Sequence, residues 1–90
     1  MSASETAVLP KHAVLRLHVT AEADPQSLAR VLERFVNLDI TPRCVHAEWG
    51  IQGVFHVEVD VAGLSEERMT LIAAKVGQAT PVLNAYWHPI

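Results

Sequence analysis

The chain has a single cysteine, Cys44, among its 90 residues, which excludes an internal disulfide and the cysteine pairs of thiolate zinc sites. No apolar run approaches the ~20 residues that span a bilayer, and the first twelve residues lack the basic and apolar regions of a secretory signal. A lone cysteine suits a reducing compartment. We therefore expect a cytoplasmic protein with no membrane partner.

The chain also lacks a basic field. Its seven Lys and Arg are scattered and are outnumbered by ten Asp and Glu, which gives a net charge of -3. Nucleic acid is therefore not expected as a partner. Ninety residues suffice for one domain with one modest core. We expect a flexible tail over residues 1–12 and a single domain over residues 13–90.

Two segments alternate between apolar and polar residues, which is typical of strands with one buried face. Residues 13–20, AVLRLHVT, place Leu15, Leu17 and Val19 on one face. The second segment, VFHVEVDVA, is the clearest strand in the chain, and it places on one face Phe55, Val57, Val59 and Val61.

Two other segments have the spacing of amphipathic helices. Asp24 before Pro25 predicts a helix start, because the carboxylate accepts from free amides and proline gives up no needed donor. Ser65 predicts a second start, with Leu64 and Met69 at staple positions and Gly77 as a stop. The apolar stripes of the two helices comprise Leu28, Val31, Leu32 and Phe35, and Met69, Ile72, Ala73 and Val76.

Two further strands complete the pattern. Residues 40–49 are expected to form one, with Val45, Ala47 and Trp49 inward, and the loop between Gly50 and Gly53 joins it to the next strand as a hairpin. Pro81 is expected to open a last strand, VLNAYWH, whose inward residues are Leu83, Ala85 and Trp87.

The order is therefore strand, helix, strand, strand, helix, strand. This order predicts an α+β protein of the ferredoxin-like βαββαβ type. Its four-stranded antiparallel sheet carries two helices on one face.

The first helix and its flanks resemble the ACT domain, the small regulatory module of amino-acid metabolism. The matching residues are Leu28, Arg30, Val31 and Phe35. Within that group the chain is most similar to the short small subunit of acetolactate synthase (acetohydroxyacid synthase). The resemblance implies a non-catalytic regulatory or stabilising subunit in branched-chain amino-acid biosynthesis. It also implies a large catalytic partner that holds thiamine diphosphate, flavin and magnesium, so no cofactor is expected in this chain.

The resemblance implies an amino-acid effector site built from two segments, Asp24, Gln26, Ser27 and Leu28, and Asp39, Ile40 and Thr41. Both segments depart from the family. Gln26 stands where valine-sensing members have Gly, Leu38 and Asp39 replace an Arg-Gly pair, and Thr41 replaces an Asn. We therefore expect weak or no valine sensing. The alternative is a free-standing ACT dimer that binds an amino acid on the amides of Gln26, Ser27 and Leu28.

The polar face of the sheet is a second candidate site. Alternation places ten polar side chains away from the helices, namely Arg16, His18, His46, Glu48, His56, Glu58, Asp60, Asn84, Tyr86 and His88. His18 is expected to approach His56, and His46 to lie opposite His56 or Glu58. Imidazoles with a carboxylate are a sufficient ligand set for Zn, Ni or Cu, so His18, His46 and His56 form a hypothetical metal site. The competing interpretation is a solvated or subunit-contacting face.

Cys44 lies near His46 on the same predicted face, and a thiol beside an imidazole could act as a nucleophile. A nucleophile also needs a cleft and an oxyanion site, which one small sheet does not offer by itself. We therefore expect no catalytic residues.

Ferredoxin-like sheets leave edge strands unpaired, and a second copy often covers such an edge. We therefore expect a homodimer.

Overall fold

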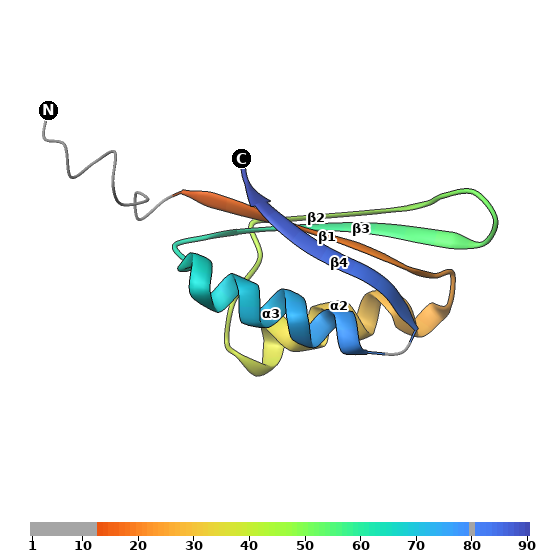
Figure 1. Ribbon diagram of the computed structural model, residues 1–90, viewed down its shortest axis with the longest axis horizontal. Helices are drawn as coiled ribbons and strands as arrows, with labels where there is room; N and C mark the ends of the chain where they lie inside the picture. The colour runs from red at the N-terminus through yellow and green to blue at the C-terminus, as the bar shows by residue number, and fades with distance from the viewer. Residues whose placement is uncertain (1–12, 80) are drawn as a thin grey trace, which may run out of the picture.

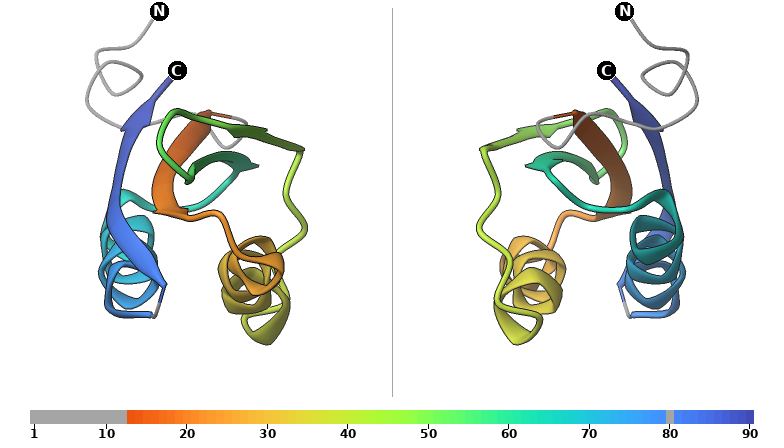
Figure 2. Two further views of the ribbon diagram at one scale, coloured as in Figure 1. Left: turned by 90° about the vertical axis from the view of Figure 1, so that its right-hand side faces the viewer. Right: turned by 90° about the vertical axis from the view of Figure 1, so that its left-hand side faces the viewer.

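The computed structural model describes residues 13–79 and 81–90, so the predicted tail lies outside the described residues. It confirms the predicted fold (Figure 1). The sheet is antiparallel throughout, with the strand order β2-β3-β1-β4. Figure 2 shows both helices on one face of this sheet. The elements in chain order are β1 (Val14–Glu22), α2 (Pro25–Asn37), β2 (Cys44–Trp49), β3 (Val54–Ala62), α3 (Glu66–Gln78) and β4 (Val82–Pro89).

The core lies between the helices and the two central strands. Phe35 and Met69 are its largest helical contributions, and both side chains are fully buried. Burying a side chain of this size contributes roughly 1.5–3 kcal/mol. The strand contributions to the core are Leu15, Leu17, Val19, Ala21, Val57, Val59 and Val61. Because β1 and β3 are held by this core, the polar residues that alternate with these positions are displayed on a fixed surface.

Both helices begin where the sequence predicts. Asp24 caps α2, and the Ser65 hydroxyl accepts from the Arg68 amide at 3.1 Å to cap α3. The predicted stop at Gly77 is wrong, because α3 continues to Gln78 and its C-cap is Ala79. Neither of the 13-residue helices that the structure describes is long and apolar enough to cross a membrane.

Strand β2 differs from its prediction in length and burial. It begins at Cys44, four residues after the predicted start, because Pro42 has no amide hydrogen to donate to a ladder. Val45 and Trp49 lie opposite Val59 and Phe55 on the helix-facing side, yet they are 40% and 69% exposed. Their predicted inward orientation is confirmed, but both side chains stay exposed because β2 is an edge strand and the helices pack mainly against β1 and β4.

Strand β4 contains an irregularity that the alternation did not predict. Ala21 pairs with Val82 while its neighbour Thr20 pairs with Asn84, so Leu83 is the extra residue of a bulge. Leu83 is 58% exposed, and its predicted inward position is wrong. Val82 packs against the core in its place, and Ala85 and Trp87 pack there as predicted.

Candidate functional site

The junction between β1 and α2 is closed by its own residues. Asp24 has an extended backbone, and its side-chain Oδ1 accepts from the Gln26 amide at 2.8 Å. The Asp24 carbonyl accepts from the Ser27 amide at 2.9 Å. Two of the first-turn amides that would meet an effector carboxylate therefore already have partners within the chain.

Ser27 is part of the core rather than of an open binding surface. Its side chain is fully buried, and its Oγ donates to the Glu22 carbonyl at 2.5 Å. This bond ties the first turn of α2 to the last residue of β1. The Ser27 side chain therefore fixes the junction from within.

The second predicted effector segment, residues 39–41, follows the end of α2 directly. Asp39 has a left-handed φ of 59°, the Asp39 amide donates to the Val36 carbonyl at 3.0 Å, and the Ile40 amide donates to the Phe35 carbonyl at 2.9 Å. These two bonds define a Schellman motif with Asp39 in the position that glycine usually takes.

The two predicted effector segments lie at opposite ends of the 13-residue helix α2, which is roughly 20 Å long. Within one chain the structure does not bring residues 39–41 to the Asp24 junction.

Two aromatic residues that the sequence did not assign to the site lie beside the junction. Trp49 and Phe55 are paired across the β2–β3 hairpin and meet edge to face, with ring centroids 6.4 Å apart. The hairpin is fixed to the junction by a hydrogen bond from the Ala23 amide to the Gly53 carbonyl at 2.8 Å. A hollow of about 300 Å³ results, and it is lined by Ala23, Asp24, Pro25, Leu28, Trp49 and Phe55.

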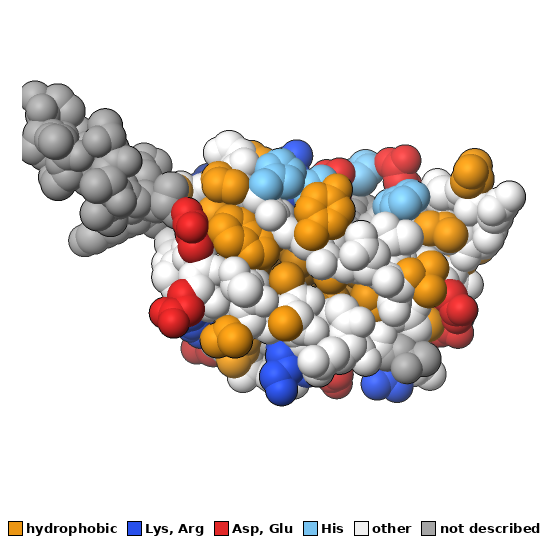
Figure 3. Space-filling model, viewed as in Figure 1, with side chains coloured by type: hydrophobic (Ala, Val, Ile, Leu, Met, Phe, Trp, Pro, Cys, Tyr) orange, Lys and Arg blue, Asp and Glu red, His pale blue; other side chains and the backbone are white. Residues whose placement is uncertain are grey.

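The other face of the sheet carries the polar residues, as predicted. In Figure 3 the histidines gather on the side of the molecule away from the helices. The strongest contact there is a bidentate pair, in which Arg16 donates to both carboxylate oxygens of Asp60 at 2.7 and 2.9 Å. The Arg16 guanidinium lowers the pKa of Asp60, although burial of the carboxylate opposes that shift. The same bond raises the pKa of Arg16.

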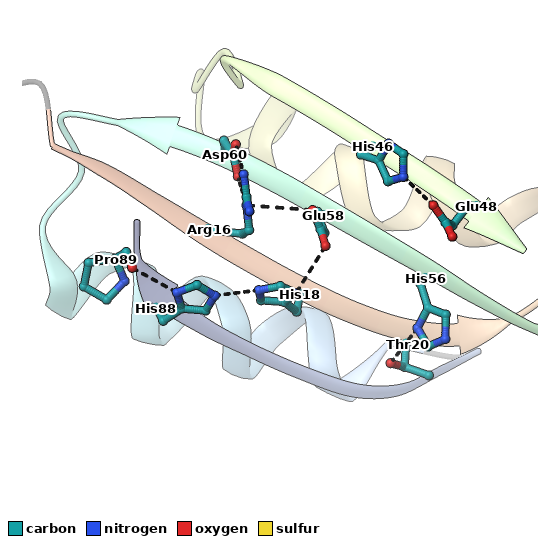
Figure 4. Close-up of polar contacts among 10 residues, drawn as sticks. All are labelled: Arg16, His18, Thr20, His46, Glu48, His56, Glu58, Asp60, His88 and Pro89. Atoms are coloured by element: carbon teal, nitrogen blue, oxygen red, sulfur yellow. Dashed lines mark hydrogen bonds and ion pairs between the residues drawn. The ribbon is translucent and has the colours of Figure 1, made fainter. Parts of the chain in front are cut away.

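Each histidine of the predicted metal set has a different partner (Figure 4). His46 contacts Glu48 at 2.5 Å, and this hydrogen bond raises the pKa of His46. His56 contacts Thr20 at 3.4 Å. His18 pairs with Glu58 of β3 rather than approaching His56, and burial lowers its pKa.

The structure therefore does not bring His18, His46 and His56 together. Within residues 13–79 and 81–90, no group of three or more His, Cys, Asp or Glu side chains is arranged to hold a metal. The hairpin places His46 opposite Glu58, one of the two predicted positions. Metal binding by this face stays a prediction.

Cys44 is exposed on the same face and lies opposite Asp60. The polar side chains around it line an open groove of about 500 Å³. The imidazole of His46 is engaged by Glu48 rather than by the thiol.

Comparison with known proteins agrees with this architecture. Residues 8–90 match the family model described as ACT-like domain, so the chain belongs to the ACT-like domain family. ACT-like domains are generally regulatory and bind amino acids. No curated protein matches the chain.

Solved structures share the fold at low sequence identity. The C-terminal domain of the MgtC protein from Mycobacterium tuberculosis has a TM-score of 0.72 at 14% identity, and the match covers 89% of each chain. The ACT domain from GTP pyrophosphokinase of Chlorobium tepidum has a TM-score of 0.71 at 10% identity, with 86% of this chain and 99% of that chain covered. An uncharacterized protein from Thermotoga maritima has a TM-score of 0.67 at 13% identity, with coverage of 86% and 95%.

Proposed function

We propose that this ACT-like domain is a non-catalytic regulatory or stabilising small subunit of an amino-acid biosynthetic enzyme, and that it responds weakly or not at all to valine. The enzyme that the first helix points to by resemblance is acetolactate synthase. The observation that carries the proposal is the hydrogen bond from the Gln26 amide to the Asp24 carboxylate at 2.8 Å. The carboxylate of Asp24 therefore occupies the start of α2, where an effector carboxylate would bind.

An amino-acid effector would have to compete with Asp24 for the start of α2. Losing an N-cap costs about 0.5–2 kcal/mol, which corresponds to a loss of affinity of roughly 2- to 30-fold. The negative charge of Asp24 would also repel the carboxylate of the effector. Both effects weaken sensing while leaving the domain folded.

The exposed edge of the sheet supports a role in assembly. All residues of β2 except Ala47 are exposed, and its outer edge has no partner strand within the described part of the chain. Exposed apolar side chains line this strand and its hairpin, including Val45, Trp49 and Ile51. Unpaired edges of this kind are commonly covered by another chain. We propose that a second copy and the large catalytic chain are the partners.

Co-purification tests the proposed partner. The tagged chain is co-expressed with the large acetolactate synthase chain of the same genome and passed through gel filtration with light-scattering detection. We expect the catalytic chain to co-elute with the tagged domain, and the domain alone to elute with twice the mass of one chain. Elution of the domain without the catalytic chain would overturn the subunit role.

A free-standing amino-acid sensor is the second candidate, and the apolar hollow beside Asp24 favours it. Its volume of about 300 Å³ lies at the lower end of the range for small-molecule sites. Calorimetric titration with valine, leucine and isoleucine tests this function. Micromolar binding that Trp49→Ala abolishes and Trp87→Phe preserves would establish the sensor. Absence of binding heat with all three amino acids would exclude the sensor function for branched-chain amino acids.

A further inference from the structure

His18 and His88 face each other across the polar side of the sheet. Their Nε2 atoms are 2.7 Å apart, and their ring planes are nearly parallel at 18° (Figure 4). One nitrogen must donate and the other must accept at this distance. Because the Nδ1 of His88 lies 2.9 Å from the Pro89 carbonyl, which only accepts, His88 carries its proton there and presents a free lone pair at Nε2.

The outer nitrogen of His88 has the kind of partner that a metal-binding imidazole needs, and the outer nitrogen of His18 lies near one. A ligating histidine generally donates its second N–H to a carbonyl or a carboxylate, which fixes the ring. The Pro89 carbonyl takes this role for His88, and the Glu58 carboxylate lies 3.8 Å from the His18 Nδ1. The Tyr86 ring also stacks against His18, with ring centroids 4.8 Å apart.

We propose that His18 and His88 form a two-imidazole site for a divalent first-row transition metal, with Cu²⁺ bound most tightly. Metal–imidazole bonds of about 2.0–2.1 Å place two cis nitrogens of a tetragonal ion about 2.9 Å apart. This separation is close to that of the two Nε2 atoms. The rings turn so that both lone pairs meet at one ion, and β4, being an edge strand, leaves room for this movement.

Metal binding changes the tautomer of His18 without changing the number of bound protons. In the metal-free pair the His18 Nε2 carries the hydrogen that it donates to His88. When the metal takes this nitrogen, that proton leaves and Nδ1 acquires one, facing Glu58. Both imidazoles stay neutral, as ligation requires.

The site is a pair rather than a closed cage. The described part of the chain brings no third His, Cys, Asp or Glu to it, so water or a second molecule completes the coordination. The His18 side chain is 22% exposed and His88 is exposed, so an ion can reach them. His46 and His56, held by Glu48 and Thr20 on the same face, serve as matched controls.

Titration with Cu²⁺ tests the site. His12 is the one histidine of the sequence that lies outside the described residues, so it is replaced first, and the parent for these measurements is the full chain carrying His12→Gln. This parent is titrated in the presence of glycine as a competing chelator, and circular dichroism verifies the fold of each variant. We expect at least a tenfold loss of affinity for His18→Gln and for His88→Gln, and less than a twofold change for His56→Gln. Electron paramagnetic resonance should show two coupled nitrogens in the parent and fewer in either pair variant.

Equal affinities for the parent and both pair variants would overturn the proposal, as would an affinity that falls only with His46→Gln or His56→Gln. A parent that binds Cu²⁺ no better than the double variant His18→Gln/His88→Gln would also overturn it. None of these outcomes depends on the proposed catalytic partner.

Discussion

Arg16 and Asp60 form the best-defined polar contact in the protein. Asp60 is 8% exposed, although it lies on the side of the sheet that the helices do not cover. Its carboxylate is therefore partly shielded from water, and the bidentate guanidinium satisfies both of its oxygens. Removing one partner of such a contact leaves the other charge poorly solvated. Its loss therefore lowers the free energy of unfolding more than the loss of an exposed ion pair does.

Asp60→Asn tests this contact at the level of one residue. We expect the free energy of unfolding to fall by roughly 1–3 kcal/mol, because a charge-assisted bond is lost. The control is Glu48→Gln, which weakens an exposed contact with His46 and should change stability much less than Asp60→Asn does, because solvent screens exposed ion pairs. Urea unfolding measures both. Equal effects for the two variants would contradict the special role of Asp60.

The lowered pKa of Asp60 predicts how stability depends on pH. Because the folded-state pKa lies below the ordinary value of 3.8, the folded state favours the ionised form. The resulting stabilisation is fully present above that value and is lost as the pH falls through the folded-state pKa. Melting temperatures of the parent and Asp60→Asn should therefore differ at pH 6 and converge towards pH 2.5. A difference that stays constant over this range would contradict the prediction.

An aspartate lies at each end of helix α2 and defines where the helix begins and ends. Asp24 supplies the carboxylate that caps its start, and Asp39 adopts the left-handed conformation that ends it. The first role follows from the Asp-Pro pair in the sequence. The second was not predicted, since the family resemblance placed Asp39 in an effector segment. The backbone bonds of the Schellman motif give Asp39 a structural explanation.

Asp39→Gly tests the end of α2. A residue with a Cβ is strained at a φ of 59°, so glycine should raise the free energy of unfolding by roughly 0.5–1 kcal/mol despite its greater freedom in the unfolded chain. Glu33→Gly, at an exposed position inside the helix, is the matched control and should lower stability. Thermal unfolding measures both variants. Destabilisation by Asp39→Gly would show that the aspartate side chain, rather than the backbone turn, holds this end.

The central elements could be predicted from the sequence because β1 and β3 each bury one whole face, which produces strict alternation. The edge strands could be predicted only in part. Val45 has the expected orientation, but its exposure depends on how far the helices extend over β2. The bulge at Leu83 comes from the pairing of β4 with β1. That same pairing brings His88 near His18, which explains why local spacing did not reveal the histidine pair.

At the scale of the whole molecule, the candidate effector site and the candidate metal site lie on opposite sides of the sheet. The helix layer contains the junction at Asp24, where effector sensing would occur, and the opposite face of the sheet carries the histidines and the Arg16–Asp60 pair (Figures 3 and 4). The exposed edge of β2 lies between these two surfaces. A partner could therefore bind this edge while the junction stays closed, as a stabilising subunit without effector control would require.

The most direct test of this account is the rate of acetolactate formation by the large chain from the same genome, measured alone and with this domain, each with and without valine. The account predicts that the domain raises the rate or prolongs activity, and that valine leaves the rate of the complex unchanged. A rate that the domain does not alter would contradict the subunit role, and strong inhibition of the complex by valine would contradict the closed junction at Asp24.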